Sequence, residues 1–184
     1  MIIGHVGVAF AARWRWPAAP LPWLLGGSMA PDIWRALLAA TGLDWRETNI
    51  YSHLLPWSGL LAVLVAAAAY LVLRDARVAL LIFAVVGSHI ALDMVSGWKE
   101  LWVGGPGGLD LEHFEQLEFV VEAVLLWGGW RLLRRSTAPR RLSGWPVLAL
   151  LLSIQAAYLI ESFQARPWKT RCIAYPLSPC WSHL

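Results

Sequence analysis

The sequence predicts an all-α fold, a polytopic bundle of about six transmembrane helical segments. Three observations lead to this prediction. Hydrophobic residues make up 58% of the 184 residues and charged residues only 15%, whereas soluble domains have about 25% charged residues. The mean hydropathy is +0.54. The chain also contains 13 tryptophans, many of them beside apolar runs, which is typical of side chains that anchor helices at membrane surfaces.

Six apolar stretches of helical length account for the expected helices. The first, Ile2 to about Arg13, is too short to span a bilayer by itself. The second is interrupted by Pro31, which cannot continue a regular helix. The others are near the ~20 residues that a membrane span requires. The six expected segments are 2–13, 21–42, 53–73, 77–98, 116–133 and 144–163.

The positions of the arginines set the expected orientation, because loops rich in arginine stay in the cytoplasm. Arginines occur between segments one and two, between three and four, and, most densely, in 131–141 between five and six. Alternating spans place these three loops on the same side. We therefore expect a multi-pass protein of the inner (cytoplasmic) membrane. The N-terminus, the loops 44–52 and 99–115 and the C-terminus are then outside.

The chain is expected to form one membrane domain followed by a short tail. Residues 1–165 make the transmembrane bundle that carries the candidate site, and 166–184 make an extracytoplasmic tail. Cys172 and Cys180 lie in this tail, where an oxidising compartment would permit a disulfide between them. The net charge of +3 is small and is carried by loop arginines, which argues against a nucleic-acid partner.

Ionisable side chains are costly inside a membrane and usually mark a functional site. His89 and Asp93 lie four residues apart in an apolar stretch, so both point to the same side of a helix. In the expected orientation, six of seven such residues fall in the outer half of the membrane, and the seventh, Asp32, near its middle. This predicts a single site that faces the extracytoplasmic side. The seven residues are His5, Asp32, His53, His89, Asp93, Glu118 and Glu122.

Imidazole and carboxylate groups together suit a divalent metal, zinc first, with manganese or iron as alternatives. Five of the seven residues could bind it, enough for one metal with an open position or for two metals that share a carboxylate. Glu118 and Glu122 are expected to act as general base for a metal-bound water or as partners of a ligand histidine. The expected metal ligands are His5, Asp32, His53, His89 and Asp93.

Four motifs in order resemble those of the predicted membrane-bound metal-dependent hydrolases, a family that includes LexA-regulated inner-membrane proteins. They are GH at 4–5, APDI at 30–33, YSHLL at 51–55 and SHIALDM at 88–94. The resemblance covers about residues 4–131 and implies metal ligands at the same five positions. Glu122 is similar to a glutamate in the helix that follows in some members. Trp34 and Thr48 stand where the family has a second acid and a first histidine.

With this resemblance, we expect a membrane-embedded hydrolase that activates water against an amphiphilic ester or phosphoester, such as a phospholipid. The expected partners are membrane lipid and an amphiphilic small-molecule substrate. The alternative is a non-catalytic membrane protein that binds or transports a cation or proton through the same residues. A transporter needs a polar path to the cytoplasm, and the inner halves of the segments contain almost no ionisable residue, which favours the enzyme.

A serine nucleophile is a further alternative, because Ser52-His53 and Ser88-His89 place a hydroxyl beside an imidazole. Neighbouring side chains on a helix point about 100° apart, so we do not expect a histidine to activate the serine before it. The G-x-S-x-G turn of the α/β-hydrolases does not occur in the sequence. The metal-dependent reaction is therefore preferred.

Overall fold

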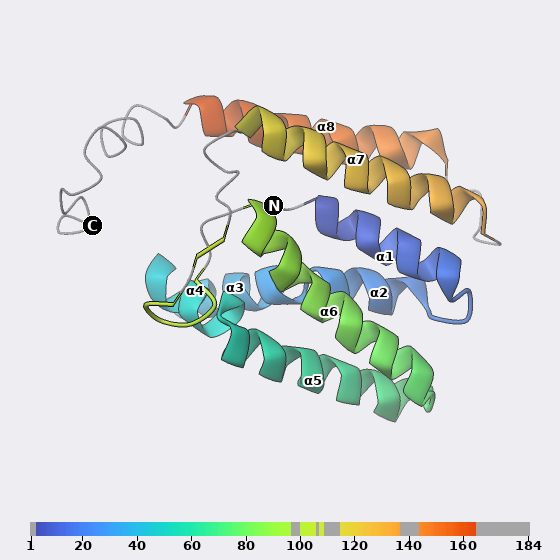
Figure 1. Ribbon diagram of the computed structural model, residues 1–184, viewed down its shortest axis with the longest axis horizontal. Coiled ribbons are helices and arrows are strands. Elements are labelled where there is room, and N and C mark those ends of the chain that lie inside the picture. Colours follow the sequence, from blue (N-terminus) through green and yellow to red (C-terminus); the bar gives the residue numbers. More distant parts are fainter. Residues whose placement is uncertain (1–2, 97–99, 106, 109–114, 137–143, 165–184) are drawn as a thin grey trace.

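The structure, a computed structural model, describes residues 3–96, 100–105, 107–108, 115–136 and 144–164. Over these residues the chain forms eight helices and no strand (Figure 1). The all-α prediction is confirmed. The tail 166–184, with Cys172 and Cys180, lies outside the described residues.

Short helices come first along the chain and long ones follow. The short helices are α1 (Gly4–Arg15), α2 (Leu21–Ser28), α3 (Ala30–Ala40) and α4 (Trp45–His53). The long helices are α5 (Leu55–Leu73), α6 (Ala76–Ser96), α7 (Glu115–Arg134) and α8 (Trp145–Gln164). Within the described part of the chain, two helices, α5 and α6, are long and apolar enough to cross a membrane. The bundle of six spans therefore stays a prediction.

The expected segment 21–42 is two helices rather than one. The break lies at Met29, where φ is −104° and ψ is 3°, and not at Pro31. Pro31 lies in the first turn of α3. Backbone N–H groups in the first turn have no acceptor within the helix, so a proline there removes no helical hydrogen bond. The break lies three residues before Asp32, so it directly precedes this site residue.

The expectation that 44–52 form a loop is wrong, because α4 begins at Trp45 and Asp44 is its N-cap. Asp44 and Glu47 form a capping box at its start. The Asp44 side chain accepts the backbone N–H of Glu47 at 2.8 Å, and the Asp44 N–H donates to the Glu47 side chain at 3.3 Å. This D-x-x-E spacing is a sequence signal for a helix start. As a result, His53 ends a helix instead of opening one.

The helices pack in layers, which run from α8 through α7 and α1 to α2 and α6, and then to α5 (Figure 1). One apolar core lies where α1, α2, α5 and α6 meet and includes Ile82 and Val86. A second lies where α1, α2, α7 and α8 meet and includes Leu126 and Trp130. α1 contributes to both cores, so the helix that carries His5 is held from two sides.

α1 and α7 approach each other at backbone contact. A Cβ atom at Gly7 would overlap the carbonyl of Leu125, and one at Gly129 would overlap the carbonyl of Gly7. Gly128, the neighbour of Gly129, has open space around it. Small residues permit such close approach between membrane helices. The contact fixes α1 against α7, near the point where Glu122 meets the start of α1.

Candidate metal centre

Five of the seven predicted site residues come together at one end of the bundle, where α1 begins and α6 ends (Figure 1). They come from four helices, so distant parts of the chain build the cluster. Four of them are buried, whereas the Asp32 side chain is 23% exposed. The cluster consists of His5 from α1, Asp32 from α3, His53 from α4, and His89 and Asp93 from α6. We call these five residues the His/Asp cluster.

Asp93 contacts all three histidines. Its Oδ1 atom lies 3.3 Å from Nε2 of His5. Its Oδ2 atom lies 3.4 Å from Nε2 of His53 and 3.6 Å from Nε2 of His89. The rings of His5 and His89 stack with centroids 3.7 Å apart. Each oxygen of this buried carboxylate therefore faces at least one ring nitrogen.

Asp32 is the partly exposed member of the cluster. Its Oδ1 atom lies 3.4 Å from Nε2 of His53, and its Oδ2 atom lies 3.8 Å from Nε2 of His89. Donor atoms at about 2.1 Å from a tetrahedral zinc ion lie about 3.4 Å from one another. The separations within the cluster are close to this value. A buried group of this kind could hold a metal ion.

The hydrogen bond behind His89 decides which of its ring nitrogens faces the cluster. Its Nδ1 atom lies 2.8 Å from the backbone carbonyl of Ser28, which can only accept, so Nδ1 carries the hydrogen. In the neutral ring, Nε2 then presents a lone pair to Asp32 and Asp93. Among the residues that the structure describes, this buried nitrogen has no hydrogen-bond partner. A cation would compensate for the cost of burying it unpaired.

His53 is oriented in the same way by a side chain. The Ser52 hydroxyl donates to the carbonyl of Thr48 at 2.6 Å and lies 2.6 Å from Nδ1 of His53. Because the hydroxyl hydrogen points to Thr48, His53 is the donor in the second contact. Its Nε2 atom, too, presents a lone pair to the carboxylates. Metal-binding histidines are commonly held by such a hydrogen bond at the other nitrogen.

Ser52 and His53 are in contact although they are neighbours on one helix. α4 ends at His53, and the next residue, Leu54, is extended (φ −69°, ψ 143°), so the ring is not held as in the middle of a helix. The contact does not make Ser52 a nucleophile, because its hydroxyl is already donated to a backbone carbonyl. At the second pair, Ser88 donates to the carbonyl of Val85 instead.

Asp32 lies outside the two candidate spans, and its surroundings favour the charged carboxylate. Burial alone would raise the pKa of this carboxyl. When protons occupy the histidines of the cluster, the contact with His53 and the positive charges of His89 and His53 outweigh burial and the nearby Asp93, and they lower the pKa of Asp32 below its ordinary value. An ionised carboxylate is the form that binds a metal. Protons compete with metal for such sites, so a proton at this cluster is the rival occupant.

Glu122 lies at the start of α1 rather than among the candidate ligands. Its buried Oε2 atom accepts the backbone N–H of Ile3 at 3.0 Å and that of Gly4 at 3.3 Å. The N-cap residue of α1, Ile3, has no side chain that could cap the helix, so a carboxylate from α7 satisfies these N–H groups. His5 follows Gly4 directly. Glu122 therefore fixes the first turn of the helix that carries His5.

The general-base role expected for the two glutamates stays a prediction. The described residues form two groups of candidate ligands, which share His89 and include neither glutamate. Glu118 is half-buried in the first turn of α7, one turn before Glu122.

Sequence reasoning missed the groups that support the ligands. The carbonyls of Ser28 and Thr48 have no sequence signal, because every residue carries a carbonyl. Trp34, which stands in the position of the resembled family's second acid, donates its indole N–H to the carbonyl of Tyr51 at 3.2 Å. This bond ties α3 to α4, and with them Asp32 to His53.

Comparisons with known proteins identify no family. No protein-family model, no curated protein and no solved structure matches the chain. The likeness to the membrane-bound metal-dependent hydrolases thus stays a resemblance of motifs. The function is inferred from the chemistry of the cluster.

Proposed function

We propose that the protein is a membrane-embedded, metal-dependent hydrolase that acts on an amphiphilic ester or phosphoester such as a phospholipid. The His/Asp cluster would hold a divalent ion, zinc first, with manganese or iron as alternatives. One observation carries the proposal. Nδ1 of His53 lies 2.6 Å and Nδ1 of His89 lies 2.8 Å from an oxygen atom, so in the neutral tautomer with the hydrogen on Nδ1 both rings turn an Nε2 lone pair toward two carboxylates. Lone pairs and negative charges converge there, and a cation balances them.

An open side of the cluster favours catalysis over a purely structural ion. Structural zinc sites are closed by four protein ligands, whereas catalytic sites keep a position for water or substrate. Asp32 is the partly exposed member of the cluster, and the other four residues are buried. A bound divalent ion would supply a water with its pKa lowered to about 7 and polarisation of the scissile bond. Asp32 marks the side from which substrate reaches the cluster.

The depth of the cluster favours an amphiphilic substrate. His53 lies just before α5, and Asp93 lies in the last turn of α6. If these helices cross the membrane, the cluster lies where hydrocarbon meets the polar head groups. The apolar surface of α5 is exposed, since only 17% of its apolar window is buried. A core helix of a soluble protein would be mostly buried, so lipid is the favoured surrounding.

The orientation of the protein in the membrane is inferred from the positions of the arginines in the sequence. The positive-inside rule puts the loop 131–141 in the cytoplasm, and the start of α1 on the opposite side. We infer a multi-pass protein of the inner membrane, with the cluster at the extracytoplasmic face. Lipids of the outer leaflet of that membrane would then be the accessible substrates.

The test combines metal analysis with a substrate panel. Protein purified in detergent is expected to carry about one divalent ion per chain or more. A chelator should abolish turnover of a member of a panel of phospholipids and lipid phosphates, and metal add-back should restore it. Metal-loaded protein that hydrolyses no panel member, but passes cations or protons in liposomes, would support the non-catalytic alternative. Protein without bound metal would contradict the metal site itself.

Replacement of Ser52 by alanine should weaken metal binding without abolishing it. The variant loses the oxygen that holds Nδ1 of His53, and loss of such a support typically lowers metal affinity by about 10- to 100-fold. Ser88→Ala is the matched control, because Ser88 also precedes a cluster histidine but donates its hydroxyl to the backbone carbonyl of Val85. Competition with a chromophoric chelator measures both affinities. Equal affinities in the two variants would show that Ser52 does not orient His53.

A further inference from the structure

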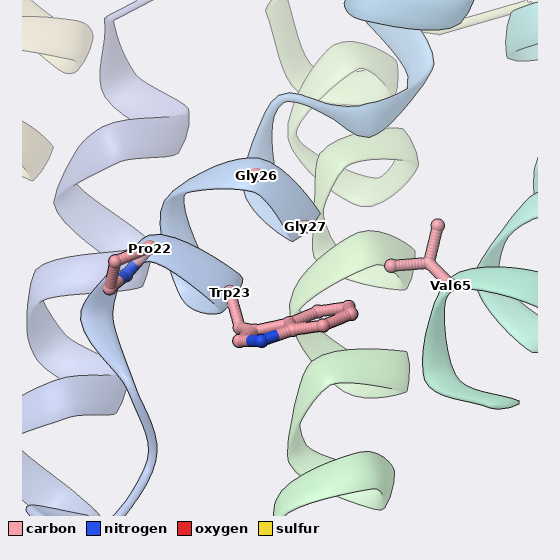
Figure 2. Close-up of a pocket in the computed structure, with 5 residues that line it drawn as sticks. All are labelled: Pro22, Trp23, Gly26, Gly27 and Val65. Carbon is pink, nitrogen blue, oxygen red and sulfur yellow. The ribbon is translucent and has the colours of Figure 1, made fainter. Parts of the chain in front are cut away.

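An apolar hollow of ≈ 290 Å³ lies between α2 and α5 and is not part of the His/Asp cluster. Figure 2 shows the indole of Trp23 pointing from α2 toward Val65 of α5, with Gly26 and Gly27 on the same helix. None of the lining residues is ionisable, and the indole N–H of Trp23 is the single polar side-chain group. The lining residues are Pro22, Trp23, Gly26, Gly27 and Val65.

The glycines account for the hollow. A Cβ atom at Gly26 would meet no atom within 4 Å, so space is left beside α2 where another residue would place a side chain. Gly26 is also exposed, so the hollow opens to the surroundings of the bundle. Its far wall includes α5, the candidate span with the more exposed apolar window. If α5 spans the bilayer, the opening faces lipid hydrocarbon.

Helix α2 connects the hollow to the cluster. Ser28 follows Gly27 directly, and its carbonyl holds Nδ1 of His89. A Cβ atom at Gly27 would lie 3.5 Å from side-chain atoms of both Ile82 and Val86, so α2 is seated against α6 within one turn of His89. The hollow and the cluster are therefore neighbours along α2.

We propose that this hollow binds one acyl chain of a membrane lipid whose head group lies at the cluster. This inference rests on the proposed function and specifies its substrate class, a lipid ester or phosphoester with an intact acyl chain. The lining is apolar, as hydrocarbon requires, and the volume is at the lower end of small-molecule pockets, which suits one chain rather than a whole lipid. A protein partner would need a much larger contact area.

The experiment uses Gly26→Leu, which adds an apolar side chain at a lining position of the hollow where the Cβ atom would meet no other atom within 4 Å. The full-length protein is placed in phosphatidylcholine nanodiscs with a trace of the same lipid carrying a diazirine in one acyl chain. After photolysis, cross-linked peptides are mapped by mass spectrometry. We expect labelling of the segment 22–27 in the parent protein and a decrease of about tenfold in Gly26→Leu, a loss of affinity that corresponds to 1.4 kcal/mol. Gly128→Leu, on α7 and also with open space around it, is the matched control and should keep the parent's labelling.

Labelling and turnover separate this inference from the proposed function. Undiminished labelling of 22–27 in Gly26→Leu, or labelling no stronger than on the outer face of α5, would overturn the acyl-chain site. Labelling that behaves as expected in a protein that hydrolyses no lipid would keep the site and refute the hydrolase. If turnover is observed, Gly26→Leu should raise KM for long-chain substrates and leave turnover of a water-soluble short-chain analogue and metal content unchanged. Equal KM effects on both substrates would also contradict the proposal.

Discussion

Replacement of Asp93 by asparagine is expected to remove the bound metal and, with it, turnover. Asp93 is the residue whose two oxygens face all three histidines at 3.3–3.6 Å. Asparagine keeps the shape of the side chain but loses the negative charge, and its NH₂ group places hydrogens where a ligand oxygen was. Loss of an anionic ligand should lower metal affinity by more than the roughly 100-fold that loss of a supporting partner can cost.

The control for Asp93→Asn is the same substitution at the other end of α6. Asp75 accepts the backbone N–H groups of Arg77 at 2.9 Å and Val78 at 3.2 Å at the start of that helix. Asparagine caps helices about as well as aspartate, so Asp75→Asn should keep both metal and fold. Metal analysis after size-exclusion chromatography, with the helical circular dichroism of each variant, gives the comparison. An Asp93→Asn protein that folds and retains a full complement of metal would show that Asp93 is not a ligand.

The cost of polar groups in an apolar chain explains why the cluster could be predicted from the sequence. His89 and Asp93 interrupt an apolar stretch at a spacing that puts them on one helix face, and no simpler role accounts for them. The expected arrangement of spans then placed His5 and His53 at the same depth. The structure brings these residues together from helices that are far apart along the chain. Polar residues that interrupt apolar helices are therefore useful guides to one another as partners.

The local structure around the cluster was harder to predict. The stretch 44–52 is polar enough to resemble a loop, and the capping box of Asp44 and Glu47 was the signal that a helix starts there. The orientation of the histidines depends on acceptors such as the Ser28 carbonyl, which is set by the helix break at Met29 and by packing of α2 on α6. Such contacts come from tertiary structure, and no residue pattern records them.

The contact of Glu122 with the start of α1 also comes from tertiary structure, and no residue pattern records it. A pair of substitutions tests its role. Glu122→Ala should destabilise the start of α1, because two backbone N–H groups lose their buried acceptor, at about 1–3 kcal/mol for each unsatisfied group. The His5 ligand is then less well held, and metal affinity should fall with the melting temperature. Glu122→Gln keeps a side-chain oxygen in the same place, so it should retain most of the stability and metal content.

Turnover of the glutamine variant decides between positioning and general-base catalysis. Glutamine can accept the N–H groups of Ile3 and Gly4 but cannot take a proton from water. If Glu122 only positions α1, turnover per bound metal should be near that of the parent in Glu122→Gln, and metal loss alone should account for the defect of Glu122→Ala. A glutamine variant with normal metal content and turnover about 10²-fold lower would instead identify Glu122 as the base. Because Oε2 already accepts two backbone N–H groups, we expect the first result.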